Sequence, residues 1–274
     1  MKNSIFIFLI FLSLNCFGED SLILKINVTS TFLTTDNLFN VYYINDKQEI
    51  MQFNYVDSTQ RSYSNKQFGS PTLIDASNAL KILVFYSDYN TVVLLDNKLA
   101  ELSVIKLSNN INKNNYQPTA ICKESESDFI WMYDDLSRKL IKLDESGNAA
   151  AESESFDQLF NFSIQEPRLF SVNNKLYLYT STQGLLVFDN YANYIYTISE
   201  IPKTPDQVND KFYLCTLDTE ISMYIFQSQF ELLLSLPEKN GLQTNLVGDK
   251  IFLRTPDQIA ILSLIHISEP TRPY

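Results

Sequence analysis

The side chains best suited to chemistry in this chain are carboxylates. Glu124, Glu126 and Asp128 alternate with two serines, and alternate side chains of an extended strand point the same way. Carboxylates gathered on one face are ligands that a hard cation such as Ca²⁺ takes, although a solvated turn between strands explains the same pattern. Asp134 and Asp135 are adjacent and suit an acid–base or metal-binding pair, or the aspartates that hairpin turns favour.

Nucleophilic and imidazole chemistry has little support. His266 is the only histidine of the 274 residues. It lies in the segment 262–272, which resembles a translated sequencing-library adapter and is left out of reasoning about the fold. Without it, Ser–His–Asp triads and imidazole-based zinc sites are excluded. Ser103 and Lys106 match the S-x-x-K spacing, but they fall on an expected strand rather than at a helix start. We therefore predict no catalytic residues and no cofactor, and leave a metal site open.

Composition excludes further classes of function. The chain has 21 basic and 32 acidic residues, a formal net charge of -11, which disfavours the clustered phosphate contacts of nucleic-acid binding. None of its 6 glycines falls in the arrangement of a phosphate-binding loop or a nucleophile elbow. With 45% hydrophobic residues, the chain can bury a substantial core.

The N-terminal segment has the pattern of a secretory signal. Lys2 is followed by an apolar run through Leu14 and by the small residue Gly18, which predicts a signal peptide over 1–18. The run is shorter than the ~20 helical residues that a bilayer requires, so no membrane-spanning helix is expected. Cys16 offers a lipid anchor as an alternative to cleavage. We expect an exported protein, periplasmic or associated with the outer membrane, with a single domain over 19–261 and a non-native tail over 262–274.

Internal repeats determine the predicted fold. A lysine followed by three apolar or aromatic residues occurs at 175–178, 211–214 and 250–253, each time after a valine and a two-residue turn pair. The turn pairs are Asn173-Asn174, Asn209-Asp210 and Gly248-Asp249, which suit tight hairpins. Looser copies at 41–43, 83–85 and 129–131 complete six units with spacings of 36 to 47 residues. These spacings are typical of four-stranded propeller blades.

The sequence thus predicts an all-β, six-bladed beta-propeller of four-stranded antiparallel blades. The last unit supplies strands near 250–254 and 258–261, and 22–28 supplies its outer strand, which closes the ring and removes an exposed edge. Two stretches, Leu80–Asp96 and Leu185–Asp189, resemble blades of NHL, YWTD and TolB-like propellers, and more closely exported propeller proteins of Bacteroidetes. Cys122 and Cys215 are expected as small buried residues, with a disulfide as the alternative.

Two long connections between blades are the predicted binding surface. The connection over 60–70 carries Arg61, Tyr63, Asn65, Lys66 and Phe68, and the connection over 108–117 carries five asparagines and Tyr116. Aromatic residues and Asn are types that recognition loops use, although a genome biased toward Asn, Lys and Tyr codons explains this composition equally. Both join an outer strand to the next inner strand and should therefore lie on one face. Phe68 is expected to be exposed there, in one patch with the other predicted binding residues: Tyr63, Asn112, Asn115 and Tyr116.

These features favour a noncatalytic cell-envelope scaffold, expected as a monomer, that holds a protein or glycan partner on the loop-bearing face. The alternative is a calcium-dependent propeller enzyme of the lactonase or lyase type. Its cation would be held by acids facing the central channel, for which Asp36, Asp75 and Asp128 are the candidates.

Overall fold

The computed structural model describes residues 22–264 apart from 110–113, 125, 200, 202, 227–229 and 237–239, and for 109, 114 and 230–235 it describes the backbone alone. Predictions concerning the signal peptide over 1–18, Cys16, Asn112 and His266 therefore fall outside the described residues.

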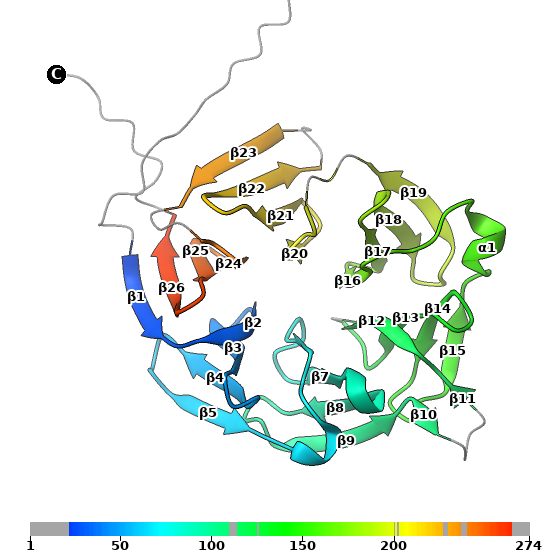
Figure 1. The fold of residues 1–274 in the computed structure, drawn as a ribbon, viewed down its shortest axis with the longest axis horizontal. Helices are drawn as coiled ribbons and strands as arrows, with labels where there is room; N and C mark the ends of the chain where they lie inside the picture. The colour runs from blue at the N-terminus through cyan, green and yellow to red at the C-terminus, as the bar shows by residue number, and fades with distance from the viewer. Residues whose placement is uncertain are drawn as a thin grey trace, which may run out of the picture.

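Six four-stranded antiparallel sheets stand around a central axis, as the repeats predict (Figure 1). Blade 1 contains β2 (Ser30–Thr35), β3 (Asn40–Asn45), β4 (Ile50–Asn54) and β5 (Gln60–Tyr63). Blade 2 contains β6 (Leu73–Asp75), β7 (Ile82–Tyr86), β8 (Thr91–Leu95) and β9 (Glu101–Lys106). Blade 3 contains β12 (Pro118–Lys123), β13 (Ile130–Asp134), β14 (Lys139–Leu143) and β15 (Ala149–Glu152).

The second half of the ring follows the same order. Blade 4 contains β16 (Arg168–Val172), β17 (Lys175–Thr180), β18 (Gly184–Asp189) and β19 (Tyr194–Ile198). Blade 5 contains β20 (Gln207–Val208), β21 (Phe212–Thr216), β22 (Glu220–Ile225) and β23 (Phe230–Ser235). Blade 6 contains β24 (Gln243–Val247), β25 (Lys250–Arg254), β26 (Gln258–Ser263) and the N-terminal β1 (Leu22–Asn27). Short elements lie between them: η2 (Lys66–Phe68), η3 (Ser87–Tyr89), β10 (Ser108–Asn109), β11 (Asn114–Asn115) and α1 (Phe156–Leu159).

The two ends of the propeller chain meet in blade 6, which confirms the predicted ring closure. β1 pairs antiparallel with β26, with Lys25 opposite Ala260, and Figure 1 shows the two strands side by side. β26 continues to Ser263, two residues past the expected domain boundary at Ile261, and Leu262 is fully buried. Closure matters because a free outer edge would expose unpaired backbone groups.

Turn residues explain much of the repeat pattern. Asn173 and Asn174 have φ of 46° and 59°, the left-handed values that a tight hairpin requires. The aspartates that follow the third strand cap the next hairpin with one carboxylate oxygen. Asp96, for example, accepts hydrogen bonds from the backbone N–H groups of Lys98 and Ala100 at 2.7 and 2.8 Å, and Asp144 and Asp189 repeat this arrangement.

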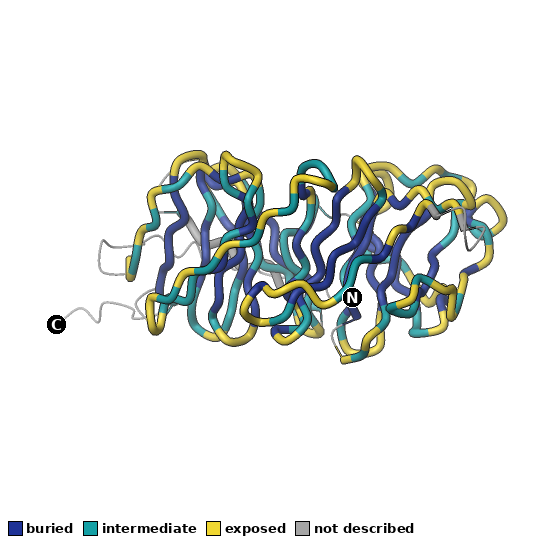
Figure 2. The backbone as a smooth tube through the Cα atoms, turned by 90° about the horizontal axis from the view of Figure 1, so that it is seen from below, coloured by how far each residue is buried: buried dark blue, intermediate teal, exposed yellow. Residues whose placement is uncertain are grey.

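The core lies between neighbouring blades rather than within any one of them. Between blades 3 and 4, Phe156 is fully buried and stacks on Phe188 with ring centroids 5.7 Å apart. Figure 2 shows the buried backbone in the middle of the ring and the exposed turns on its two faces. Cys122 and Cys215 are buried free thiols, so the disulfide alternative does not apply. Within the described chain, no helix is long and apolar enough to cross a membrane.

Polar side chains link the innermost strands of adjacent blades. Asp75 accepts a hydrogen bond from the backbone N–H of Lys123 at 2.8 Å. The amide of Gln207 both donates to and accepts from the backbone of Leu246, at 3.0 and 2.8 Å. Because the inner edge of each sheet has no further strand, these side chains satisfy backbone groups that face the axis.

Candidate functional site

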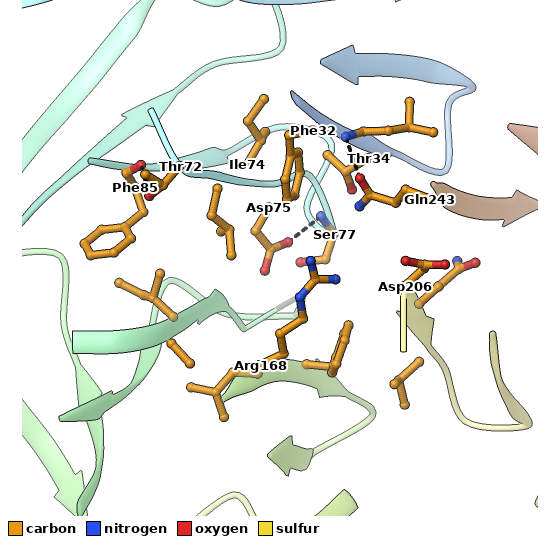
Figure 3. Close-up of a pocket in the computed structure, with 18 of the residues that line it drawn as sticks. Phe32, Thr34, Thr72, Ile74, Asp75, Ser77, Phe85, Arg168, Asp206 and Gln243 are labelled. Atoms are coloured by element: carbon orange, nitrogen blue, oxygen red, sulfur yellow. Dashed lines mark hydrogen bonds between the residues drawn. The ribbon is translucent and has the colours of Figure 1, made fainter. Parts of the chain in front are cut away.

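A cavity of about 770 Å³ lies on the propeller axis and is lined by the innermost strands of all six blades (Figure 3). Its volume is within the roughly 300–1,000 Å³ of small-molecule sites. The lining combines apolar residues with hydroxyl and amide side chains. Its charged members are Asp75, Arg168 and Asp206.

The innermost strands all begin at one end of this cavity, because each is reached by a connection from the outer strand of the preceding blade. Four of them begin at or just after a proline, namely Pro71, Pro118, Pro167 and Pro205. A residue without an N–H group suits the start of an edge strand. The residues that follow these prolines all line the cavity: Thr72, Thr119, Arg168 and Asp206. We refer to this end as the mouth.

Arg168, Asp206 and Arg254 form a charged group at the mouth, here called the mouth cluster. Arg168 is the first residue of β16, and its Nη1 donates to the carbonyl of Pro205 at 3.3 Å. Arg254 ends β25, lies opposite Gln243, and donates from Nη1 to the carbonyl of Ser30 at 2.8 Å. Figure 3 shows Arg168, Asp75 and Asp206 extending from different strands into the cavity.

The members of the mouth cluster lie within range of one another's charge. Burial raises the pKa of Asp206 to about 6, although hydrogen bonds from Thr216 and the positive charges of Arg168 and Lys203 oppose the rise. Burial also lowers the pKa of Arg254, with Asp206 acting against that change and Arg168 adding to it. Two guanidinium groups and one carboxylate therefore share a partly desolvated space, where charges interact more strongly than in water.

Six buried polar atoms have no hydrogen-bond partner among the described residues: Ser30 Oγ, Thr35 Oγ1, Ser103 Oγ, Arg138 Nε, Asn245 Oδ1 and Arg254 Nε. Asn245 and Thr35 both line the cavity and are 6% and 9% exposed. Leaving a buried polar group unpaired costs about 1–3 kcal/mol, so such atoms are uncommon where a fold needs only stability. The groups that the cavity itself offers to a ligand are the guanidinium of Arg168, the carboxylates of Asp75 and Asp206, and several hydroxyl side chains.

The acids predicted to hold a cation are not brought together. Asp36 caps the turn after β2, accepting from the backbone N–H groups of Leu38 and Asn40, both at 2.9 Å. Asp75 reaches the cavity, but Asp128 is exposed and pairs with Lys81 at 2.6 Å. Within the described part of the chain, no group of three or more His, Cys, Asp or Glu side chains could hold a metal ion.

The alternating acids after β12 are separated by a turn. Glu124 is buried and pairs with Lys142 at 3.1 Å, whereas Glu126 is exposed. Asp134 is buried and accepts from the backbone N–H groups of Gln117 and Ser137, at 2.6 and 2.9 Å. The turn interpretation accounts for Asp134, whereas Glu124 is neither a cation ligand nor solvated but one partner of a buried ion pair.

The predicted binding surface requires two corrections. Residues 60–63 form β5, the outer strand of blade 1, and not part of a loop. Phe68 is half-buried rather than exposed, because its ring packs edge-on against Tyr86 with centroids 5.6 Å apart. Aromatic side chains at the blade surface here complete the core.

The other predicted binding residues have varied surroundings. The Tyr63 hydroxyl donates to Glu101 at 2.8 Å, and Tyr116 packs against the core between blades 2 and 3. Asn115 is exposed in β11, and Asn112 lies outside the described residues. The connections after β5 and β9 do join outer to inner strands, as predicted.

Sequence reasoning missed the mouth cluster and Asn245. The available signal was the recurring proline before the innermost strand, which places the following residue at the axis. That signal identifies Arg168 and Asp206. It does not identify Arg254, because Arg254 ends β25, which is the second strand of blade 6 and not an innermost strand.

No protein-family model and no curated protein matches the sequence. Among solved structures, the chain is similar to virginiamycin B lyase from Staphylococcus aureus, with a TM-score of 0.53 and 12% identity over 88% of this chain and 98% of that chain. The same values apply to a catalytically inactive variant of that lyase, in which a histidine is replaced by alanine, with quinupristin. At this identity the similarity shows the propeller fold and nothing finer.

Proposed function

We propose that this protein is an exported, noncatalytic binding or assembly scaffold of the cell envelope, which holds a protein or glycan partner on the face that carries the mouth. The observation that carries the proposal is the axial cavity, which the innermost strands of all six blades line with hydroxyl and amide side chains together with Asp75, Arg168 and Asp206. Such groups gain hydrogen bonds when a ligand arrives.

The charged residues of the cavity suit binding better than proton transfer. Arg168 offers guanidinium N–H donors and no acceptor. Asp75 has one carboxylate oxygen on the backbone N–H of Ser77 and the other on that of Lys123. Burial raises the pKa of Asp206 to about 6, whereas acid–base catalysis usually uses a positioned pair.

The binding function is tested with the small-molecule and glycan fraction of an envelope extract. Purified protein is mixed with the fraction, and retained compounds are released by denaturation and compared with the input by mass spectrometry. We expect compounds that are retained unchanged by the parent protein and lost by Arg168→Gln. Arg138→Gln serves as the control, because Arg138 pairs with Asp157 away from the cavity, at 3.1 Å. Conversion of a retained compound into a product contradicts the proposal.

The compartment is tested separately by fractionation of the native host. We expect the protein in the periplasmic or outer-membrane fraction, with a mature N-terminus at residue 19 or a lipidated Cys16. Recovery in the cytoplasm with an intact N-terminus contradicts export without affecting the binding assay.

The second candidate is a calcium-dependent propeller enzyme of the lactonase or lyase type. The fold similarity to a lyase favours it, and Asp75, Asp206 and Asn245 are the oxygen donors that line the cavity. This alternative predicts that Ca²⁺ raises the melting temperature, that a chelator reverses the rise, and that a bound compound is converted only when Ca²⁺ is present.

A further inference from the structure

We propose that the axial cavity binds a free basic α-amino acid such as lysine, with the α-carboxylate on Arg168, the α-ammonium on Asp206 and the side-chain ammonium on Asp75. All three protein groups line the cavity, and Figure 3 shows them extending into it from different strands. The ligand is a small molecule, so this inference goes beyond the protein or glycan partner proposed above, although it uses the same cavity.

Arg168 and Asp206 are neighbours at the mouth, and each keeps hydrogen-bonding capacity for a ligand. Nη1 of Arg168 donates to the carbonyl of Pro205, the residue before Asp206, yet the two side chains form no ion pair among the described residues. Oδ2 of Asp206 accepts from the backbone N–H and the hydroxyl of Thr216. Oδ1 accepts from no described residue and is not one of the buried unpartnered atoms. A guanidinium beside such a carboxylate matches the carboxylate and ammonium that an α-amino acid carries on one carbon.

Asp75 provides a second negative charge deeper in the cavity. It is the fourth residue after Pro71, whereas Arg168 and Asp206 each follow a proline directly. Because the innermost strands all begin at the mouth and rise about 3.3 Å per residue, Asp75 lies about 10 Å below the other two. The backbone N–H groups of Ser77 and Lys123 fix its carboxylate at 2.9 and 2.8 Å. A carboxylate has about four acceptor positions, so Asp75 can still accept from a ligand.

The wall between these two levels is mostly apolar. In blades 2 to 5 it is formed by the second and third residues after each proline, and all of these residues line the cavity. Gln207 is the one polar residue among them, and its amide is bonded to the backbone of Leu246. The others are apolar, including Ile74, Ile121 and Leu169. Such a wall suits the four-carbon stem of lysine, which is apolar between its charged ends.

The charges of the cavity and of the ligand are complementary. Two carboxylates and one guanidinium give the lining a formal charge of -1, whereas lysine carries two ammonium groups and one carboxylate. Each charged group of the ligand therefore meets an opposite charge, and the separation of the two carboxylates along the axis suits two ammonium groups on one molecule. The net charge of -11 on the whole chain also favours the approach of a cation.

The test is isothermal titration calorimetry of the purified protein with lysine and with analogues that each lack one charged group. Norleucine lacks the side-chain ammonium, 1,5-diaminopentane lacks the carboxylate, and Nα-acetyllysine lacks the α-ammonium. We expect lysine to bind at least about tenfold more tightly than each analogue, which is the effect of one charge-assisted hydrogen bond.

Variants then assign each charged group of the ligand to a residue. Asp75→Asn should weaken lysine binding about tenfold or more and leave norleucine binding unchanged, whereas Arg168→Gln should weaken both. Norleucine thus reports on the integrity of the Asp75→Asn cavity, and melting curves confirm that each variant folds. Asp128→Asn is the matched control, because Asp128 is exposed, pairs with Lys81 and is not among the lining residues. It should leave both affinities unchanged.

The inference is overturned if lysine does not bind, or if any analogue binds as tightly as lysine. Equal affinity for norleucine shows that Asp75 contacts no ammonium, and equal affinity for Nα-acetyllysine assigns the cavity to the end of a peptide. A folded Asp75→Asn variant that loses both ligands equally gives Asp75 a structural role. If lysine does not bind but an envelope component is still retained through Arg168, the proposed binding function stands. If lysine binds and no component is retained, the proposed function fails and this inference stands.

Discussion

Two charged regions of this propeller differ in whether the protein satisfies its own polar groups. In blade 3, the ammonium of buried Lys142 contacts Glu124 at 3.1 Å and Asn190 at 2.6 Å, and it lies 4.6 Å from the ring centroid of Phe129. Glu124 also accepts from the hydroxyl of Ser127. Every charge in this region has a partner from the chain.

The mouth cluster is built differently. Its arginines contact backbone carbonyls rather than Asp206, and Arg254 Nε and Asn245 Oδ1 have no partner among the described residues. The comparison teaches that charge and burial alone do not identify a site. The buried charges of blade 3 are paired within the chain, whereas Arg168 and Asp206 line a cavity that a ligand can enter.

The largest effect is expected from breaking the buried ion pair between Glu124 and Lys142 in blade 3. Glu124→Gln leaves the ammonium of Lys142 buried without its counter-charge, and loss of one partner of a buried ion pair costs about 3–5 kcal/mol. Denaturation by urea should show this loss in the free energy of unfolding. The double variant Glu124→Gln with Lys142→Met should recover much of it, because no charge is then left unpaired. A single variant as stable as the parent would place this pair among the weak surface ion pairs.

A smaller effect is expected at Phe68, on the loop-bearing face. Phe68→Ala removes a half-buried ring that packs on Tyr86, and we expect a loss of about 2–3 kcal/mol, less than for a fully buried phenylalanine. Retention of envelope compounds should be unchanged when measured below the melting transition. Lost retention with unchanged stability would assign Phe68 to the binding surface rather than to the core.

The sequence predicted the parts of the fold that depend on local pattern. Asn173-Asn174 marks a hairpin because few residues adopt left-handed backbone conformations, and the repeat spacing required an extra strand in blade 6, which β1 supplies. The alternation of Glu124, Glu126 and Asp128 misled because β12 ends at Lys123. Beyond that point the chain turns, so side chains two residues apart no longer share a face.

The mouth cluster could not be predicted in the same way. Arg168, Asp206 and Arg254 are separated by 38 and 48 residues along the chain, and they meet because three different blades converge at the axis. A motif search detects residues close in sequence or in a known spacing. Here only the recurring proline before the innermost strands pointed to the cavity, and it did so without indicating which side chains would remain unpaired.

A pH-dependent effect is expected at Asp206. Its pKa is raised by burial from the ordinary 3.8 to about 6, so the folded state binds this proton more tightly than the unfolded state. The stabilising contribution is complete below pH 3.8 and is lost as the pH rises through about 6. Asp206→Asn should therefore be more stable than the parent at pH 7.5, by about 1–2 kcal/mol after allowance for partial exposure, with the difference vanishing near pH 4. Urea denaturation at both values checks this, and a pH-independent difference contradicts it.

The smallest change in stability is expected at Arg254, a member of the mouth cluster. Arg254→Met keeps much of the length of the side chain but removes a partly buried charge whose Nε has no partner. The variant loses the hydrogen bond to the Ser30 carbonyl but no longer buries a charge. These two effects on the free energy of unfolding should cancel to within about 1 kcal/mol. Retention of envelope compounds should be unchanged, because Arg254 is not among the residues that line the cavity. Lost retention at full stability would show that Arg254 takes part in binding, and a loss of several kcal/mol of stability would make Arg254 a structural tie between blades 6 and 1.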